Sequence, residues 1–221
     1  MNESIDAQKF DPRCVKCPRL SEALGELRQQ FPTHANRPVD GFGASRYRLL
    51  IVGLAPGLHG ANRTGRVFTG DSSGSLLFKC LHRRGIADQE DASSTDARVK
   101  LVKTRITNAV KCWPPQNRPT THEIENCNPY LSFELGRLPR GGCVLALGGH
   151  AHTATLKALN LSRAKYPFAH GAIHRLGRIT LLDSYHCSRL NVNTGRLTES
   201  MLQTVIDTAA HEAKLGLVDE G

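Results

Sequence analysis

The chain has 221 residues, 39% of them hydrophobic, which suits one domain with a buried core. Lysine and arginine number 29 against 20 acidic residues, and the formal net charge of +9 favours polyanionic partners such as nucleic acid. No apolar run approaches 18 residues, and the segment MNESIDAQKFDPRC lacks the apolar core of a signal peptide. We therefore expect a cytoplasmic protein without a membrane span, whose seven cysteines do not form a disulfide framework.

The first elements along the chain surround a glycine-rich loop. Residues 1–45 are an irregular lead-in with a helix over 20–30, and RYRLLIVG (46–53) is a buried strand. The loop GLAPGLHGANRTGRVFTGD (53–71) follows, and apolar residues at helical spacing predict a helix over 72–84. The remaining pattern predicts a polar excursion (88–100), a strand (103–110), a proline-rich loop (112–118), a helix (121–138), a strand (141–149), a helix (150–159), a strand (177–186) and a last helix (198–215).

This alternation of buried strands and helices predicts an α/β fold. We expect a three-layer α/β/α sandwich around a central parallel four-stranded sheet, with residues 1–221 forming a single domain. Ligands of such sheets bind beyond the carboxyl ends of the strands. The residues expected at that rim are Gly53–Pro56, Thr107–Asn108, Gly148–Gly149 and Tyr185–His186.

The glycine-rich loop is not a known phosphate loop, because it contains neither G-K-[ST] nor G-x-G-x-x-G. Five glycines with polar side chains between them indicate a ligand pocket, although tight turns alone would also use glycine. Phe68 is the only aromatic residue of the loop. A flat apolar face beside exposed backbone amides suits a nucleobase, and core packing is the alternative role for this ring.

The cysteine spacing indicates a metal site. Cys14 and Cys17 form a C-x-x-C pair, and Cys112 and Cys127 supply two further thiols. Four thiolates can hold zinc or an iron–sulfur cluster, and the spread second half favours a cluster. Ordinary buried thiols remain the alternative for a single C-x-x-C pair.

Four stretches together resemble the uracil-DNA glycosylase superfamily, and most closely its iron–sulfur-containing family 5. They are CVKC (14–17), the loop at 53–71, ITNAVKCWPPQNRPTTHEIENC (106–127) and SYHCSRLNVNTGRLT (184–198). Family 4 is the runner-up, but its members usually carry Glu where this chain has Leu54. The resemblance implies a structural [4Fe-4S] cluster on Cys14, Cys17, Cys112 and Cys127, with Cys80, Cys143 and Cys187 as free thiols.

The resemblance also implies a repair reaction and its residues. A glycosylase extrudes a damaged nucleotide from DNA and cleaves the bond between base and sugar. Catalytic roles fall to His186, which would donate to the base O2, to Asp71, which would activate water or stabilise the sugar cation, and to Asn108, which would read the pyrimidine edge. Phe68 would stack on the base, and the slot would be lined by Gly53, Leu54, Ala55, Pro56 and Gly57. Asp71 is also a good helix N-cap, and one residue can fill both roles.

The expected partner is DNA containing uracil or another deaminated base, with hypoxanthine or modified pyrimidines as possible further substrates. Leu190 is our candidate for an apolar wedge between base steps. Phosphate or groove contacts are expected from Arg63, Arg66, Arg189, Asn191 and Arg196. The chain departs from the family at Cys187, where proline is usual and would stiffen the loop, and at Gly57, where alanine is frequent.

Two other functions are compatible with parts of this pattern. The first is a non-catalytic iron–sulfur protein that binds nucleic acid, and the presence of both Asp71 and His186 argues against it. The second is a small-molecule hydrolase or nucleotide-binding enzyme on the same sandwich, which the missing phosphate motif and the basic charge disfavour. Nothing in the sequence requires an oligomer, so we expect a monomer.

Overall fold

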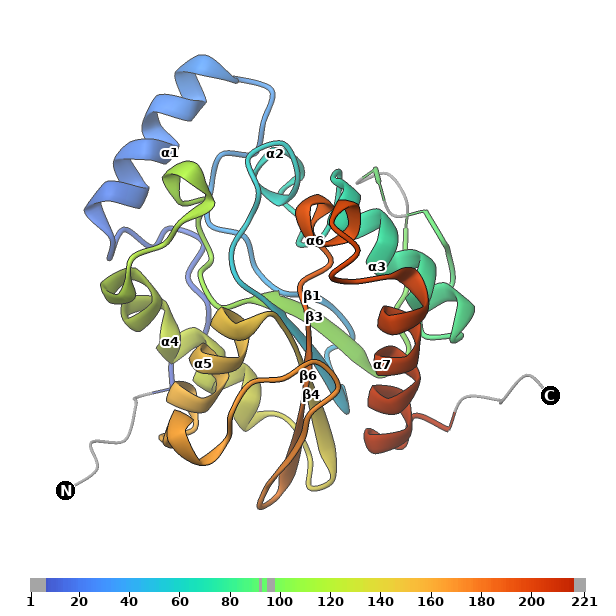
Figure 1. Ribbon diagram of the computed structural model, residues 1–221. Coiled ribbons are helices and arrows are strands. Elements are labelled where there is room, and N and C mark those ends of the chain that lie inside the picture. The colour runs from blue at the N-terminus through green and yellow to red at the C-terminus, as the bar shows by residue number, and fades with distance from the viewer. Residues whose placement is uncertain (1–6, 92, 95–97, 217–221) are drawn as a thin grey trace.

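A six-stranded sheet forms the centre of the molecule (Figure 1). The computed structural model describes residues 7–91, 93–94 and 98–216. The strand order of the sheet is β1-β3-β2-β4-β6-β5. The four central strands are parallel, and the two edge strands are antiparallel to their neighbours. The strands are β1 (Phe42–Gly43), β2 (Leu49–Gly53), β3 (Thr104–Asn108), β4 (Gly142–Leu147), β5 (Ile173–Leu176) and β6 (Ile179–Ser184).

Helices cover both faces of the sheet, which confirms the three-layer α/β/α sandwich (Figure 1). Helices α3 and α7 pack together over one face, and α4 and α5 pack together over the other. Residues of β2 point alternately into the two cores, with Leu49 and Ile51 on the α3–α7 side and Leu50 and Val52 on the α4–α5 side. The helices are α1 (Pro18–Gln30), α2 (Ala61–Thr64), α3 (Ser72–Arg83), α4 (Thr121–Gly136), α5 (Gly149–Ala158), α6 (Arg189–Asn193) and α7 (Glu199–Glu212), with 3₁₀ turns η1 (Pro115–Asn117) and η2 (Arg163–Lys165).

The prediction of a four-stranded sheet describes only its parallel centre. Strand β1 has two residues, too few to give a periodic signal. Strand β5 alternates exposed and half-buried residues and turns through Gly177, at φ 70°, into β6. The sequence analysis included Gly177 in a strand over 177–186. In the structure, Gly177 lies in the turn of a hairpin formed by β5 and β6.

The lead-in is partly ordered by α1. This helix begins at Pro18, a favoured residue for the first helical position, rather than at Leu20. Leu20 and Leu24 pack with Val110 and Tyr130 in a small separate core beside the candidate metal-binding cysteines. Residues 1–6 of the lead-in, and residues 92 and 95–97 of the polar excursion, lie outside the described residues.

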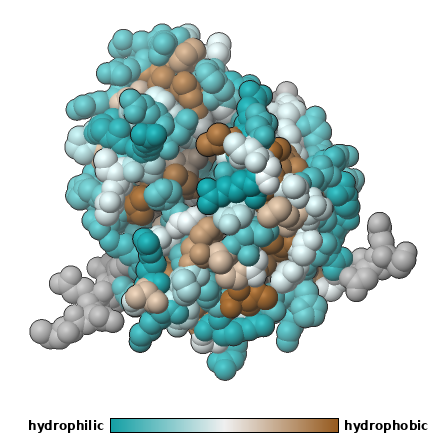
Figure 2. All heavy atoms as spheres, in the orientation of Figure 1, coloured by the Kyte–Doolittle hydropathy of each residue, from teal (hydrophilic) through white to brown (hydrophobic). Residues whose placement is uncertain are grey.

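The surface agrees with the polar composition of the chain. Figure 2 shows hydrophilic side chains over most of one face, with apolar side chains only in small separate patches. Among the described residues, no helix has the length and apolar character that crossing a membrane requires.

Candidate active site

The rim at the carboxyl ends of the parallel strands carries the predicted site. The loops that leave β2 and β3 are joined there, because Ala109 N–H donates to the Gly53 carbonyl and Val110 N–H donates to the Leu54 carbonyl, both at 2.9 Å. Gly148, which follows β4, lies against His186, which follows β6: a Cβ on Gly148 would contact the His186 Cβ at 3.4 Å. The expectation that these strand ends converge is therefore confirmed.

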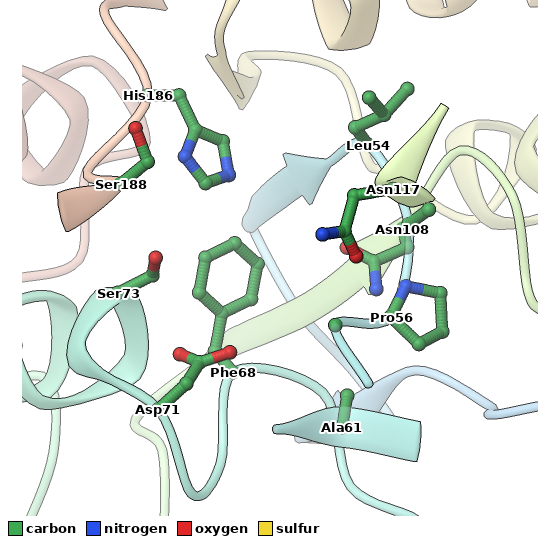
Figure 3. Close-up of a pocket in the computed structure, with 12 residues that line it drawn as sticks. Leu54, Pro56, Ala61, Phe68, Asp71, Ser73, Asn108, Asn117, His186 and Ser188 are labelled. Atoms are coloured by element: carbon green, nitrogen blue, oxygen red, sulfur yellow. The ribbon is translucent and has the colours of Figure 1, made fainter. Parts of the chain in front are cut away.

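A cavity of about 330 Å³ opens at this rim (Figure 3). This volume is typical of a site for a small ligand. Seven predicted residues line it together with Asp71: Leu54, Ala55, Pro56, Gly57, Phe68, Asn108 and His186. The analysis of the sequence missed four further lining residues, which are Ala61, Ser73, Asn117 and Ser188.

The glycines of the loop allow side chains to lie directly on the backbone. A Cβ on Gly53 would overlap the Asn108 amide and the Phe68 ring. A Cβ on Gly60 would overlap the Asp71 carboxylate, and one on Gly57 would stand 3.3 Å from Asp71 Oδ2. The loop thus cradles three of the predicted functional side chains, which is why it contains so many glycines.

Asp71 caps helix α3 and lines the cavity at the same time. Its Oδ1 accepts a hydrogen bond from Gly74 N–H at 2.9 Å. Its Oδ2 lies beside Gly57 and Gly60, and Figure 3 shows the carboxylate below the Phe68 ring. The cap holds the side chain through Oδ1, and Oδ2 is not part of that bond.

Phe68 serves the core and the cavity together. The side chain is 7% exposed and belongs to the α3–α7 core, yet it also lines the cavity. Its ring lies 6.1 Å from the His186 ring, with 30° between the planes. The backbone of Phe68 is left-handed at φ 50°, which is uncommon for a bulky residue and is often found at functional sites.

His186 faces the cavity as a neutral imidazole. Burial lowers its pKa below the ordinary value of 6.5, and the nearby charge of Asp71 opposes that shift. The carbonyl of His186 accepts a hydrogen bond from Asn191 Nδ2 at 2.8 Å, so α6 braces the loop that carries the imidazole. A neutral ring in this position can donate one N–H to a ligand atom in the cavity.

Two amide side chains lie on the opposite wall of the cavity from His186 (Figure 3). Asn108 ends β3 and is 2% exposed, and no other described residue hydrogen-bonds its side-chain amide. Asn117 follows the proline pair of the loop after β3, at φ 56°, and its Oδ1 accepts a bond from Trp113 Nε1 at 3.2 Å. Asparagine tolerates the left-handed region, so the PPQN turn was the signal that could have revealed Asn117.

The residues predicted to contact DNA occupy different environments. Arg189 and Arg196 are exposed, and the guanidinium of Arg196 lies 4.6 Å from the centre of the Tyr185 ring. Arg63 is exposed and donates to the His59 carbonyl, whereas half-buried Arg66 donates to Thr69 Oγ1 and lies over the Phe42 ring. Leu190 is 71% exposed on α6, where an apolar side chain is available to a partner.

The four candidate metal-binding cysteines line one small cavity. Cys127 Sγ accepts a hydrogen bond from Lys111 N–H at 3.4 Å, and Cys17 Sγ accepts one from Asn126 Nδ2 at 3.6 Å. Burial raises the pKa of Cys127 to about 11 and raises that of Cys112 as well, and the neighbouring thiolates add to both shifts. Two buried and two half-buried sulfur atoms around one small cavity are a donor set that fits a bound metal centre such as an iron–sulfur cluster.

Cys187, the departure from the usual proline, is held by a different contact. Cysteine lacks the ring by which the usual proline would stiffen this loop. Its Sγ instead donates to the Ser73 carbonyl at 3.4 Å, which ties the His186 loop to the first turn of α3. Burial raises the pKa of this thiol to about 12, so it is not a reactive nucleophile.

Comparison with known proteins identifies the family. The family model of the uracil DNA glycosylase superfamily matches residues 41–210. The chain belongs to the uracil-DNA glycosylase superfamily. Within it, the chain is 42% identical to a type-5 uracil-DNA glycosylase of Thermus thermophilus over 208 residues, covering 91% of this chain and 94% of that one.

The similarity is to the type-5 branch of this superfamily more than to type 4. A type-5 enzyme of Pyrobaculum aerophilum is 42% identical over 90% of this chain and 89% of its own length. A type-4 enzyme of the same organism is 34% identical over only 65% of this chain and 61% of its own. These comparisons confirm the resemblance to family 5, which the residue Leu54 had indicated.

Proposed function

We propose that this protein is a monofunctional uracil-DNA glycosylase of base excision repair. It flips a uracil out of DNA, hydrolyses the N-glycosidic bond and leaves an abasic site; hypoxanthine and modified pyrimidines are proposed further substrates. The observation that carries the proposal is the meeting of His186, Asp71, Asn108 and Phe68 around one cavity. Membership of the superfamily supports it.

The walls of the cavity suit an extruded pyrimidine. The Phe68 ring offers a flat face for stacking, and the Asn108 amide offers the donor and acceptor that match O4 and N3–H of uracil. His186 donates its N–H to O2, where negative charge develops as the base departs. The neutral imidazole stabilises the negative charge on O2 through this hydrogen bond.

Asp71 acts on the sugar side of the base. Because Oδ1 is held by Gly74 N–H, the position of Oδ2 is fixed within the cavity. The carboxylate orients a water and accepts its proton while the sugar becomes an electron-poor oxocarbenium-like centre. Ser73 and Ser188 border the same space and are available to bind the sugar or its phosphate.

The DNA surface that we propose surrounds this cavity. Arg63, Arg189 and Arg196 contact phosphates, with a smaller contribution from half-buried Arg66. Leu190 enters the stack in place of the extruded nucleotide, and Asn191 braces the loop behind it. We propose that the protein acts as a monomer, and its cytoplasmic location stays a prediction from the sequence.

We also propose that Cys14, Cys17, Cys112 and Cys127 hold a [4Fe-4S] cluster. When bound, this group cross-links the lead-in, the loop after β3 and helix α4, and it takes no part in bond cleavage. The cysteines stand near the residues they would organise, since Cys112 opens the loop that carries Asn117. The gathering of all four sulfur atoms at one cavity and the two N–H···S hydrogen bonds support a metal centre over ordinary free thiols, and the spread spacing of Cys112 and Cys127 favours a cluster over zinc.

A cleavage assay tests the proposed function. Cluster-loaded protein is incubated with a labelled duplex carrying one uracil opposite guanine, beside the same duplex carrying cytosine, and both are then treated with alkali. Scission of the uracil strand only after alkali supports a monofunctional glycosylase. Absence of scission would overturn the uracil assignment and favour the non-catalytic DNA-binding alternative, and scission without alkali would overturn the monofunctional assignment.

Replacing Gly60 with alanine is expected to lower kcat about tenfold or more, by displacing the Asp71 carboxylate from its place on the backbone. Stability should also fall, by about 1 kcal/mol or more, because displacing the carboxylate breaks its N-cap bond to Gly74 N–H. Gly25→Ala is the matched control, since a Cβ there meets nothing within 4 Å. Equal kcat values for the two variants would contradict the cradle that we assign to Gly60.

Replacing Leu190 with alanine is expected to lower kcat/KM on duplex DNA about tenfold, because unstacking costs a few kcal/mol and 1.4 kcal/mol corresponds to tenfold. On single-stranded substrate the same variant should keep most of its activity, since no helix has to be opened. Val102→Ala, at an exposed apolar residue before β3, is the control. An equal loss on both substrates would show that Leu190 is not a wedge.

A further inference from the structure

A second cluster of metal-binding side chains lies outside the proposed active site. His152 on α5, His174 on β5 and Asp183 on β6 each offer one ligand atom, and these atoms lie within 4.8 Å of one another. None of the three residues lines the cavity at the rim or the cysteine site. We propose that they form a binding site for a divalent transition-metal ion of the zinc class.

The hydrogen bonds of His152 place one of its ring nitrogens against Asp183. Its Nε2 lies 2.9 Å from the Tyr166 carbonyl, and its Nδ1 lies 2.8 Å from Asp183 Oδ1. Both neighbours are acceptors, but a neutral imidazole carries only one N–H. With that proton on Nε2, the Nδ1 lone pair faces a carboxylate oxygen, and either a second ring proton or a metal ion bound to Nδ1 relieves the repulsion.

The buried negative charge of Asp183 also favours a bound cation at this place. The carboxylate is fully buried, and among the described residues its ion-pair partners are only His152 and His174. An isolated buried carboxylate is strongly unfavourable. A divalent ion would neutralise it, and the arrival of a third donor, His174 Nε2 at 3.2 Å from Asp183 Oδ2, favours a metal over a single shared proton.

The geometry is close to that of a protein zinc site. Zinc binds imidazole nitrogen and carboxylate oxygen at about 2.0–2.2 Å, which separates tetrahedral ligand atoms by about 3.3 Å. The contacts to Asp183, 2.8 Å to Oδ1 and 3.2 Å to Oδ2, need to lengthen by at most about half an ångström, and ligand atoms that lie up to 4.8 Å apart need to move closer together. The Tyr166 carbonyl on Nε2 is the outer partner that metal-bound histidines usually have.

Metal at this point would join three elements close to the proposed catalytic histidine. Asp183 lies three residues before His186 on the same strand and loop, and β5 is the antiparallel edge strand of the sheet. The His174 side chain is 12% exposed, which leaves access from solvent. Binding replaces the hydrogen bonds of both imidazoles to Asp183, and any proton held at His152 Nδ1 or His174 Nε2 is released to buffer or moves to the other nitrogen of its ring.

Titration of the cluster-loaded protein with Zn²⁺ tests the proposal. We expect one equivalent to bind the wild-type chain, and His174→Ala to weaken binding at least about tenfold. His150→Ala, at an exposed histidine two residues from His152 on α5, is the matched control and should bind as the wild type does. No uptake, or equal uptake by wild type and His174→Ala, would overturn the proposal and leave a hydrogen-bond network.

A measurement on the wild-type chain alone covers the case in which His174→Ala does not fold. ¹¹³Cd²⁺ replaces Zn²⁺, and its NMR shift separates nitrogen and oxygen ligands from thiolates. A single resonance in the nitrogen–oxygen range supports the site. A resonance only in the thiolate range assigns the metal to the cysteines and overturns the proposal.

Discussion

Replacing His186 with alanine is expected to lower kcat by about 10²–10³-fold on a uracil-containing duplex, with a smaller change in KM. The imidazole donates to the base oxygen only as charge develops there, so its removal raises the barrier more than it weakens binding. Burial keeps the ring neutral, and a buried neutral donor needs no reorganisation as the charge appears. Single-turnover kinetics on the duplex measure this loss directly.

His186→Asn is the matched variant, because its amide can also donate a hydrogen bond and should retain part of the lost rate. A second readout does not depend on activity. The His186 ring should titrate by NMR below its ordinary pKa of 6.5, and in Asp71→Asn the pKa should fall further, because the charge that opposes the shift is gone. A rate for His186→Ala within about threefold of the wild-type rate would contradict the role of His186 as the donor to the base oxygen.

The position of the site could be predicted from the sequence because it depends on sheet topology. Buried strands without alternation require a parallel sheet, and parallel strands end at one rim. Gly53, Asn108 and His186 each stand at such an end, so chain order alone placed them together. Asn108 and His186 line one cavity, and Gly53, which was expected to line it, instead lies against Asn108 and Phe68, so the argument from strand ends holds without any use of the family.

The residues that the sequence did not reveal depend on short or irregular elements. Asn117 reaches the cavity through a left-handed turn, and Ser188 through the cap of a five-residue helix that is too short for periodicity. Ser73 lies in the first turn of α3, two residues after the N-cap Asp71. Its sequence position indicates only a residue near the start of a helix. Side-chain direction at such places follows from local dihedral angles, which hydrophobic patterns do not encode.

The contact of Cys187 shows how this chain joins its two proposed catalytic groups. The thiol connects the loop after His186 to the carbonyl of Ser73, two residues beyond Asp71. A proline at this position would fix the backbone of the loop but could not donate this bond. The relative placement of His186 and Asp71 therefore rests on a side-chain contact here, supported by Asn191 from the other side of the loop.

Replacing Cys112 with alanine is expected to remove the bound iron and the absorbance of the cluster near 400 nm, and to lower the melting temperature strongly. Loss of the sulfur atom alone resembles deletion of one buried group, which costs about 1 kcal/mol. Loss of the cluster also weakens the connection between the lead-in, the loop after β3 and α4, which then rests on a small separate core and on polar contacts such as the Arg19–Glu123 ion pair. Iron analysis, absorbance and thermal unfolding measure the three effects.

Cys143→Ala is the control that distinguishes loss of the cluster from loss of a buried sulfur atom. Cys143 is fully buried in β4 and does not line the cysteine cavity, so this variant removes an equivalent atom without a cluster ligand. It should keep its iron and lose only the small packing contribution. Because Cys112 opens the loop that ends at Asn117, Cys112→Ala should also lose activity, whereas Cys143→Ala should not. Iron retained in both variants would contradict the ligand set, and zinc found in place of iron in the wild type would contradict the cluster itself.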